Sequence, residues 1–143
     1  MGIKHIVDYG VIAILAVMSI IAVAVAIERF KFFKKVNVSE YKTLEILELE
    51  LTRHLHIIAT IGSNAPYVGL LGTVLGIMFT FSVMGEGAGA NVNDIMTGLA
   101  LALKATAAGL LTAIPAIILY NILHRKANEL LLLKEDELER EKL

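Results

Sequence analysis

A long stretch that carries almost no charge dominates this sequence. Between residues 64 and 121 only Glu86, Asp94 and Lys104 are charged, and the two acids lie in a Gly-rich break. The break separates two apolar segments, residues 61–84 and residues 95–123. About 20 helical residues, rising about 1.5 Å each, cross the roughly 30 Å hydrocarbon layer of a bilayer. The stretch therefore predicts a membrane hairpin of two helices.

A third apolar run covers residues 6–27 and is followed by a cluster rich in Lys and Arg over residues 28–35. A cleaved signal peptide is one interpretation, because A-x-A patterns occur at residues 22–24 and 24–26. However, a signal peptide carries its positive charge before an apolar core of about 7–15 residues. The run is longer than that and its basic cluster comes after it, which favours a first membrane helix.

Composition supports a membrane protein and argues against several other classes. Of the 143 residues, 57% are hydrophobic and 19% are charged, which is more apolar than a soluble domain. The chain has no cysteine, and its net charge of −1 argues against nucleic acid as a partner. His54 and His56 would lie about 200° apart on a helix, so they do not form a metal pair. We expect no enzyme activity, no metal and no cofactor, because no phosphate-binding loop, nucleophile motif or metal spacing is present.

The distribution of Lys and Arg predicts how the three spans are oriented. The N-terminal segment holds only Lys4, and the loop over residues 85–94 holds no basic residue. Basic residues are concentrated in residues 28–61 and in the tail after residue 123. The positive-inside rule then places the N-terminus and the loop outside, with the connector and the tail in the cytoplasm.

This pattern gives four segments and a fold class. We expect an N-terminal membrane helix (1–27), a cytoplasmic helical connector (28–61), a membrane hairpin (62–123) and a cytoplasmic helical tail (124–143). The protein is predicted to be an all-α membrane protein with three transmembrane helices and cytoplasmic helical extensions.

The connector can be read in two ways. Residues 47–51 alternate Leu and Glu as a strand would, but leucines also recur at helical spacing from Leu44 onward. A single strand would have no partner, so we favour a helix, with Ser39 as its N-cap. In the tail, Leu130, Leu131 and Leu138 are expected to be available to partner helices.

Two threonines of the hairpin are expected to meet near the middle of the membrane. Thr73 and Thr106 are equally distant from the centre of the loop over residues 85–94, so antiparallel helices place them at one depth. That depth is about 12 residues, or roughly 18 Å, from the loop. Their hydroxyls could bond water or a protonatable partner without burying a charge. The alternative is that each hydroxyl only bonds a carbonyl of its own helix.

Small residues and prolines mark the same two spans. Gly69, Gly72 and Gly76 lie at helical spacing in the second span, and Gly109 lies in a stripe of small residues in the third. Small residues allow close helix packing or a narrow pore lining, and spacing does not separate the two. Pro66 and Pro115 each remove a helical hydrogen bond, so we expect a bend at each.

Lys104 is the exceptional residue of the hairpin, because an ionisable side chain near the middle of a membrane is costly. It lies about 200° around the helix from Thr106 and should not share that face. It could pair with an acid on another subunit, extend toward the outer interface, or line a second cavity. We favour an inter-subunit electrostatic or packing role, because a positive charge opposes cation passage.

The hairpin resembles a known family. Residues 64–78 (NAPYVGLLGTVLGIM) are similar to the second-span signature of the MotA/TolQ/ExbB proton-channel family. Residues 98–110 (GLALALKATAAGL), with 113–116 (AIPA) and 120–121 (YN), are similar to its third span. Three spans fit the ExbB and TolQ branches better than the MotA branch, and the resemblance to the ExbB branch is the stronger, with a shortened connector.

This resemblance implies a function and partners. Members of the ExbB branch form a ring, typically a homopentamer, around the single membrane helices of ExbD-like subunits in the bacterial inner membrane. They use the proton gradient to energise a TonB-like protein for import across the outer membrane, with the N-terminus periplasmic and the C-terminus cytoplasmic. The matching pore positions are Thr73 and Thr106, and Pro66 and Pro115 also match. An aspartate of the single-span partner would carry the proton.

The chain departs from the family pattern at one position. Where the family commonly has a third-span glutamate, this chain has Leu101, and Lys104 replaces an apolar residue. Three alternatives remain open: a TolQ-type subunit for envelope maintenance, a non-conducting membrane scaffold in which both threonines tolerate valine, and a subunit of a solute transporter. A transporter usually has inverted repeats, which three spans do not show.

Overall fold

The computed structural model describes residues 2–86 and 91–143, all of which lie in helices or short connections between them. The four α-helices are α1 (Gly2–Lys35), α2 (Leu44–Leu51), α3 (Leu55–Gly85) and α4 (Val92–Glu141). A short 3₁₀ helix, η1 (Val38–Glu40), follows α1. Residues 87–90 of the expected loop lie outside the described residues.

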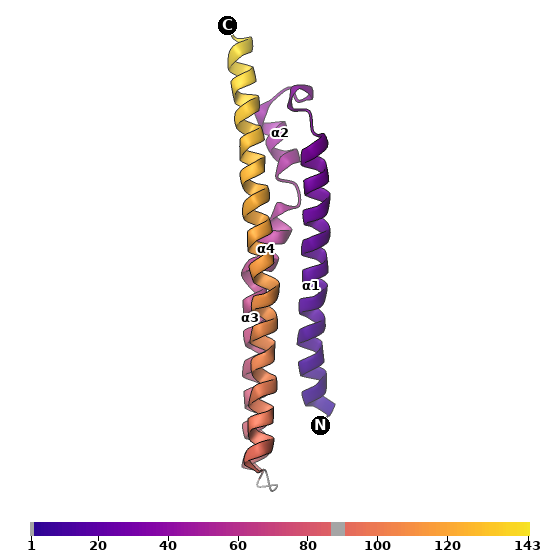
Figure 1. Cartoon of the computed structure of the whole chain (residues 1–143), viewed down its shortest axis with the longest axis vertical. Coiled ribbons are helices and arrows are strands. Elements are labelled where there is room, and N and C mark those ends of the chain that lie inside the picture. Colours follow the sequence, from indigo (N-terminus) through magenta and orange to yellow (C-terminus); the bar gives the residue numbers. More distant parts are fainter. Residues whose placement is uncertain (1, 87–90) are drawn as a thin grey trace.

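The helices form one elongated bundle with two distinct ends (Figure 1). At one end α1 begins, α3 ends and α4 begins, and we call this the loop end. At the other end lie α2, η1 and the C-terminus, and we call this the tail end. Accordingly α1 runs parallel to α4, and α3 runs antiparallel to both.

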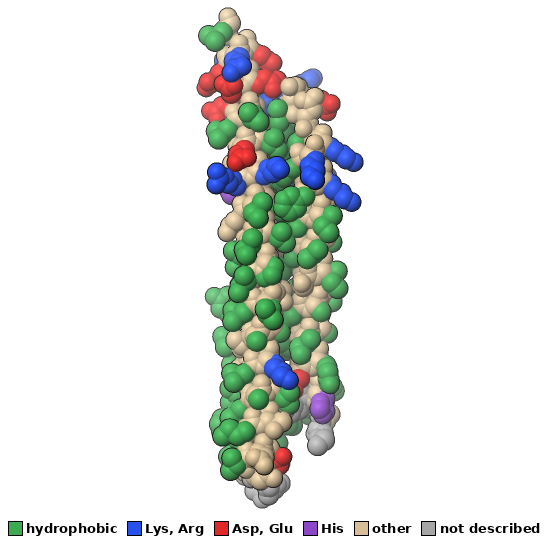
Figure 2. Space-filling model, in the orientation of Figure 1, with side chains coloured by type: hydrophobic (Ala, Val, Ile, Leu, Met, Phe, Trp, Pro, Cys, Tyr) green, Lys and Arg blue, Asp and Glu red, His purple; other side chains and the backbone are tan. Residues whose placement is uncertain are grey.

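Three helices are long and apolar enough to cross a membrane: α1 from His5 onward, α3 and α4. Their outward surfaces are apolar over the middle of the molecule, whereas Lys, Arg, Asp and Glu gather at the tail end (Figure 2). Helices satisfy every backbone hydrogen bond internally, which lipid requires. The prediction of an all-helical protein with three apolar spans is confirmed. Assembly into a ring stays a prediction.

The hairpin of α3 and α4 is held by contact between backbones. A Cβ atom at Gly69 would lie 2.6 Å from the carbonyl oxygen of Ala105 and 3.0 Å from the Cα of Gly109. A Cβ at Gly109 would lie 2.7 Å from the carbonyl oxygen of Ala65. Only glycine permits this approach, so the small-residue stripes of both helices face each other.

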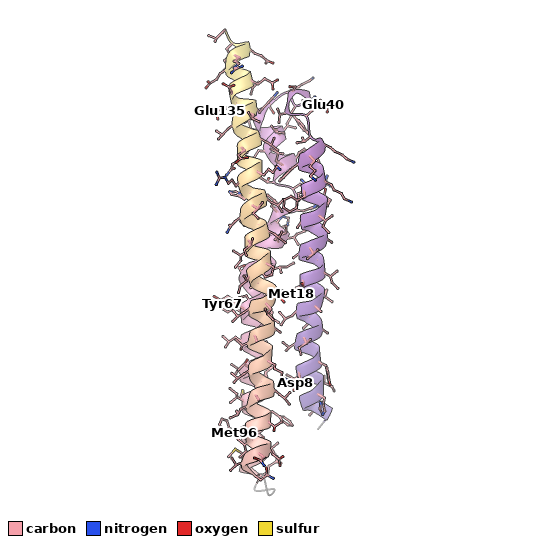
Figure 3. All side chains as sticks on the ribbon, in the orientation of Figure 1. Asp8, Met18, Glu40, Tyr67, Met96 and Glu135 are labelled. Carbon is pink, nitrogen blue, oxygen red and sulfur yellow. The ribbon has the colours of Figure 1, made fainter. Side chains whose placement is uncertain are left out.

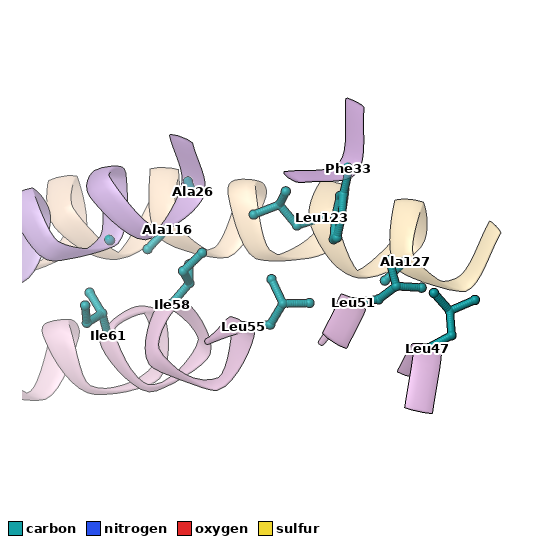
Figure 4. Packing of buried hydrophobic residues seen from close by; sticks show 11 residues of the cluster. Ala26, Phe33, Leu47, Leu51, Leu55, Ile58, Ile61, Ala116, Leu123 and Ala127 are labelled. Atoms are coloured by element: carbon teal, nitrogen blue, oxygen red, sulfur yellow. The ribbon is translucent and has the colours of Figure 1, made fainter. Parts of the chain in front are cut away.

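At the tail end, larger side chains form the packing core (Figure 4). Leu47 and Leu51 of α2 pack with Ile58 of α3 and Leu123 of α4, and each of these four is fully buried. Phe33 of α1 completes this cluster. Leu130 and Leu131 are half-buried and pack against the same cluster, and their availability to partner helices stays a prediction.

The connection between α1 and α3 differs from one continuous helix. The helix α1 extends to Lys35, and α2 is a separate helix. The N-cap of α2 is Thr43, whose hydroxyl accepts a hydrogen bond of 3.3 Å from the backbone N–H of Ile46. Ser39 instead lies within η1 and donates a hydrogen bond to Glu137, so the prediction of Ser39 as the cap is wrong.

A sharp break separates α2 from α3. His54 has a φ of 68°, in the left-handed region that a residue other than glycine seldom adopts. The helix α2 has already ended at Leu51, and His54 is the residue that precedes the start of α3 at Leu55. His54 therefore does not lie within a helix, unlike the helical pair assumed for His54 and His56.

Candidate functional site

The hydroxyl groups of Thr73 and Thr106 meet in the contact between α3 and α4. They are hydrogen-bonded to each other, and either oxygen can be the donor. Thr73 is 7% exposed, whereas Thr106 is partly exposed. The two residues that sequence spacing places at one depth are thus in direct contact.

The hydrogen bonds around Thr73 indicate which hydroxyl remains available. The Thr73 hydroxyl lies 2.8 Å from the carbonyl oxygen of Ala102 on the opposite helix and 3.3 Å from that of Gly69 on its own helix. A hydroxyl has a single proton to donate. When Thr73 donates to Ala102, Thr106 donates to Thr73, and the Thr106 oxygen keeps free lone pairs on its exposed side.

Comparison with other threonines distinguishes this pair. The hydroxyls of Thr60, Thr80, Thr97 and Thr112 donate to carbonyls of their own helix, four residues earlier. Such bonds satisfy the hydroxyl locally and are common in membrane helices. The Thr73 hydroxyl also reaches across to α4, so the interpretation that it bonds only its own helix does not describe it.

The helix α1 packs on one side of the hairpin. Val11 lies against Gly72, because a Cβ at that glycine would be 3.0 Å from Cγ1 of Val11. Val11 and Leu15 form a buried cluster with Ala105, against which Ala108 packs. Thr106 follows Ala105 by one residue, about 100° around α4 in the direction away from Lys104. Thr106 therefore opens to the side of the hairpin that α1 does not cover.

Gly72 and Gly76 extend the close contact between α3 and α4 toward the loop end. A Cβ at Gly72 would be 2.8 Å from Cβ of Ala105, and one at Gly76 would be 2.8 Å from Cβ of Ala102. Gly76, Gly72 and Gly69 thus follow α4 from Ala102 to Gly109 on both sides of Thr73. The threonine pair therefore lies within a stretch of the hairpin where the two helices approach closely.

Both prolines lie inside uninterrupted helices. Pro66 is within α3 and Pro115 is within α4, toward the tail end from the threonine pair. The bends expected at these positions stay a prediction.

Lys104 has an exposed side chain and lies on the opposite side of Ala105 from Thr106. It is near α1, because Leu101 and Ala108, one helical turn to either side, both face that helix. The geometry does not bring Lys104 to the threonine pair.

The sequence did not single out Arg29, which the structure buries to 3% exposure. Its guanidinium donates to both carboxylate oxygens of Glu28 and, over 2.6 Å, to the carbonyl oxygen of Glu50 at the end of α2. It also lies 4.4 Å from the ring centre of Phe32. Arg29 therefore joins α1 to α2 at the tail end. In the sequence Arg29 is one of several basic residues after an apolar run, so no local signal distinguished it.

A cavity of about 470 Å³ opens at the loop end between α1, α3 and α4. His5 and Asp94 are the titratable residues that line it, and Thr80 and Thr97 add hydroxyls. Most of the remaining lining is apolar, from residues such as Phe79 and Leu101.

Comparison with known proteins gives a consistent result. Residues 26–136 match the model of the MotA/TolQ/ExbB proton channel family. The chain is 56% identical over 130 residues to the biopolymer transport protein ExbB of Aquifex aeolicus, covering 91% of this chain and 88% of that protein. It is 55% identical over 133 residues to the putative biopolymer transport protein ExbB-like 2 of Helicobacter pylori, covering 93% and 88%.

A relative from the other branch matches over a shorter part. The Tol-Pal system protein TolQ of Pseudomonas aeruginosa is 49% identical over 74 residues, covering 52% of this chain and 32% of that protein. The similarity to the two ExbB-named proteins extends over nearly the whole chain.

Proposed function

Because the chain belongs to the MotA/TolQ/ExbB proton channel family, we propose that it is an ExbB-type channel subunit that uses the proton gradient to energise import across the outer membrane. The chain is 56% identical to the ExbB of Aquifex aeolicus over 88% of that protein, whereas it is 49% identical to the TolQ of Pseudomonas aeruginosa over 32% of that protein. This difference favours an ExbB role over a TolQ role in envelope maintenance. The work of the protein is transport and not the conversion of a substrate.

The hydrogen-bonded pair of Thr73 and Thr106 is the observation that carries the proposed proton route. The pair sits on the side of the hairpin that α1 leaves uncovered, and Thr106 is partly exposed there. A hydroxyl both donates and accepts, so it can hold water or a protonatable group in a fixed orientation. In this proposal Thr73 fixes Thr106, and Thr106 meets the proton carrier.

In this proposal the proton carrier comes from outside the hairpin of this chain. Along residues 64–121 the carboxylates are Glu86 and Asp94, both toward the loop end, and Leu101 stands where the ExbB and TolQ branches commonly have a glutamate. A membrane carboxylate from a single-span, ExbD-like partner would supply the missing group. A TonB-like protein would then receive the work.

A ring of copies would enclose this route. One hairpin exposes its threonine side to the surroundings and cannot form a pore by itself. Several copies, with α1 on the outside and the threonine side inward, would place the Thr106 hydroxyls around the partner helices. A homopentamer is our proposed assembly.

The proposed location is the bacterial inner membrane. The N-terminus and the loop end would face the periplasm, and the tail end, where charged side chains gather, would face the cytoplasm (Figure 2). The excess of Lys and Arg near the tail end supports this orientation.

Proton flux into vesicles tests the proposal. The complex with its single-span partner is reconstituted as wild type, Thr106→Val and Thr112→Val. Thr112 is the matched control, because it lies on the same helix and its hydroxyl bonds only the carbonyl oxygen of Ala108 in its own helix. We expect Thr106→Val to lower gradient-driven flux at least tenfold with the complex intact, and Thr112→Val to keep it.

Two results would contradict this route. Equal flux for wild type and Thr106→Val would remove the threonine pair from the proton path. Absence of flux in every intact complex, the wild type included, would favour a non-conducting scaffold.

A further inference from the structure

Two opposite charges lie in the apolar part of the molecule, on the side of the hairpin that α1 covers. Lys104 is on α4, and Asp8 is on α1, near the loop end of that helix (Figure 3). We propose that Asp8 and Lys104 form a charge pair within one chain, which docks α1 in register and keeps the lysine charge away from the threonine pair.

Packing contacts set the two residues at neighbouring depths. Val11 and Ala105 both lie against Gly72, so they mark one level of the bundle. Asp8 precedes Val11 by three residues and Lys104 precedes Ala105 by one, toward the loop end, because α1 and α4 are parallel. At about 1.5 Å per residue, their Cα atoms differ in depth by about 3 Å.

The orientation of Asp8 on α1 is also suitable. Asp8 lines a cavity of about 280 Å³ together with Leu75, Gly76 and Phe79 of α3, so it points toward the hairpin. His5, one helical turn earlier, lines the cavity that Leu101 of α4 also borders. The stretch of α1 from His5 to Asp8 thus lies against the hairpin, with Asp8 bordering α3 and His5 bordering the turn of α4 that precedes Lys104.

Reach and charge complete the argument. The ion pairs between described residues do not include Asp8 with Lys104, so the side chains must rotate to meet. Lys104 is exposed and has a long flexible stem. Because an unpaired charge in lipid is costly, two opposite charges at neighbouring depths gain by pairing.

The pair has a consequence for the threonine side. Lys104 and Thr106 project from opposite sides of Ala105. Drawing Lys104 toward Asp8 fixes its charge beside α1, where it does not repel a proton that passes Thr106. Asp8 is thus a positioning residue, and this part of the inference rests on the proposed function.

Charge reversal tests the pairing without reference to conduction. Asp8→Lys and Lys104→Asp are made singly and together, and the amount of complex that survives heating is measured. We expect each single reversal to lower it at least fivefold, and the double reversal to return it to within twofold of wild type. Asp8→Glu should resemble wild type, and Asp94→Asn is the control for loss of a different acid. A double reversal as defective as the worse single variant would overturn the pair.

Cross-linking gives a second test that does not need the reversed variants to fold. The chain has no native cysteine, so Asp8→Cys with Lys104→Cys can be joined by a short thiol-to-thiol reagent. We expect a cross-link within one chain, detected as a protein of monomer mass in which both thiols are blocked. The control variant, Asp8→Cys with Leu103→Cys, should cross-link much less. Equal joining of both pairs, or joining only between chains, would overturn the assignment.

Proton flux separates positioning from docking alone. In intact complexes, Asp8→Asn should lower flux per complex at least threefold, and Asp8→Asn with Lys104→Met should restore it. If the reversals compensate but flux does not respond to Asp8→Asn, the positioning role is wrong while the docking pair stands. If flux is also insensitive to Thr106→Val, the proposed proton route is the part that fails.

Discussion

The two halves of this bundle are held together by different means. Around the threonine pair, α3 and α4 meet through glycine and alanine, with Gly69 against the backbone of Gly109. At the tail end, Leu47, Leu51 and Leu123 fill a core with their side chains. The difference follows from the surroundings.

In lipid, a leucine gains little by moving from acyl chains to another helix, so association depends on close backbone packing. In water, each buried leucine contributes about 2 kcal/mol through removal of apolar surface. The half that would lie in the membrane therefore uses the smallest residues, and the half that would lie outside uses large ones. The same helix, α4, changes from one mode to the other along its length.

The largest expected effect is at the tail end. Leu123→Ala removes a fully buried side chain and should lower the free energy of unfolding by about 2–5 kcal/mol, from lost burial and the cavity left behind. Leu111→Ala on the same helix is the control, because Leu111 is 74% exposed and should change stability by less than about 0.5 kcal/mol. Unfolding by SDS titration measures both. Equal losses would contradict the division into two packing modes.

A smaller loss in the free energy of unfolding is expected from a substitution in the hairpin. Gly69→Ala adds a Cβ only 2.6 Å from the carbonyl oxygen of Ala105, so the helices must separate, at a cost of about 1–3 kcal/mol. The control is Gly10→Ala, where the added methyl group meets nothing within 4 Å. The same titration compares them. A Gly69→Ala protein as stable as Gly10→Ala would show that close backbone approach does not hold the hairpin.

The smallest loss of stability is expected from a change at the start of α2, and it tests whether the tail end is stabilised separately from the hairpin. Thr43→Ala removes the N-cap of α2 and should cost about 1 kcal/mol, because the N–H of Ile46 loses its partner. Thr43→Ser retains the capping hydroxyl and should lose almost nothing. Hydrogen exchange of the α2 amides measures the change. Faster exchange spread over α3 and α4 as well would indicate that α2 supports the whole bundle rather than the tail end alone.

Much of the hairpin could be predicted because its determinants are local. The length of each apolar segment requires helices, and the position of the loop sets Thr73 opposite Thr106. The structure of the connector between α1 and α3 was harder to predict from the sequence. Ser39 and Thr43 are both suitable caps by residue type, and only the packing of Leu47 and Leu51 into the cluster decides where α2 begins.

Arg29 and Asp8 show a second kind of difficulty. In the sequence, Arg29 is one of several basic residues after an apolar run, and its burial depends on the carbonyl oxygen of Glu50, 21 residues away. Asp8 lies near the start of a span, and its relation to Lys104 depends on how α1 docks. No local pattern carries either fact.

Three apolar helices, the hairpin and the common depth of two hydroxyls follow from local sequence, because segment length and distance from a loop depend on residues near each other in the chain. The tertiary structure decided the rest. It placed α1 on one side of the hairpin and left the Thr106 side open, separated α2 from α3 at His54, and buried Arg29. These features depend on which helix faces pack together, and that is a property of contacts between distant residues.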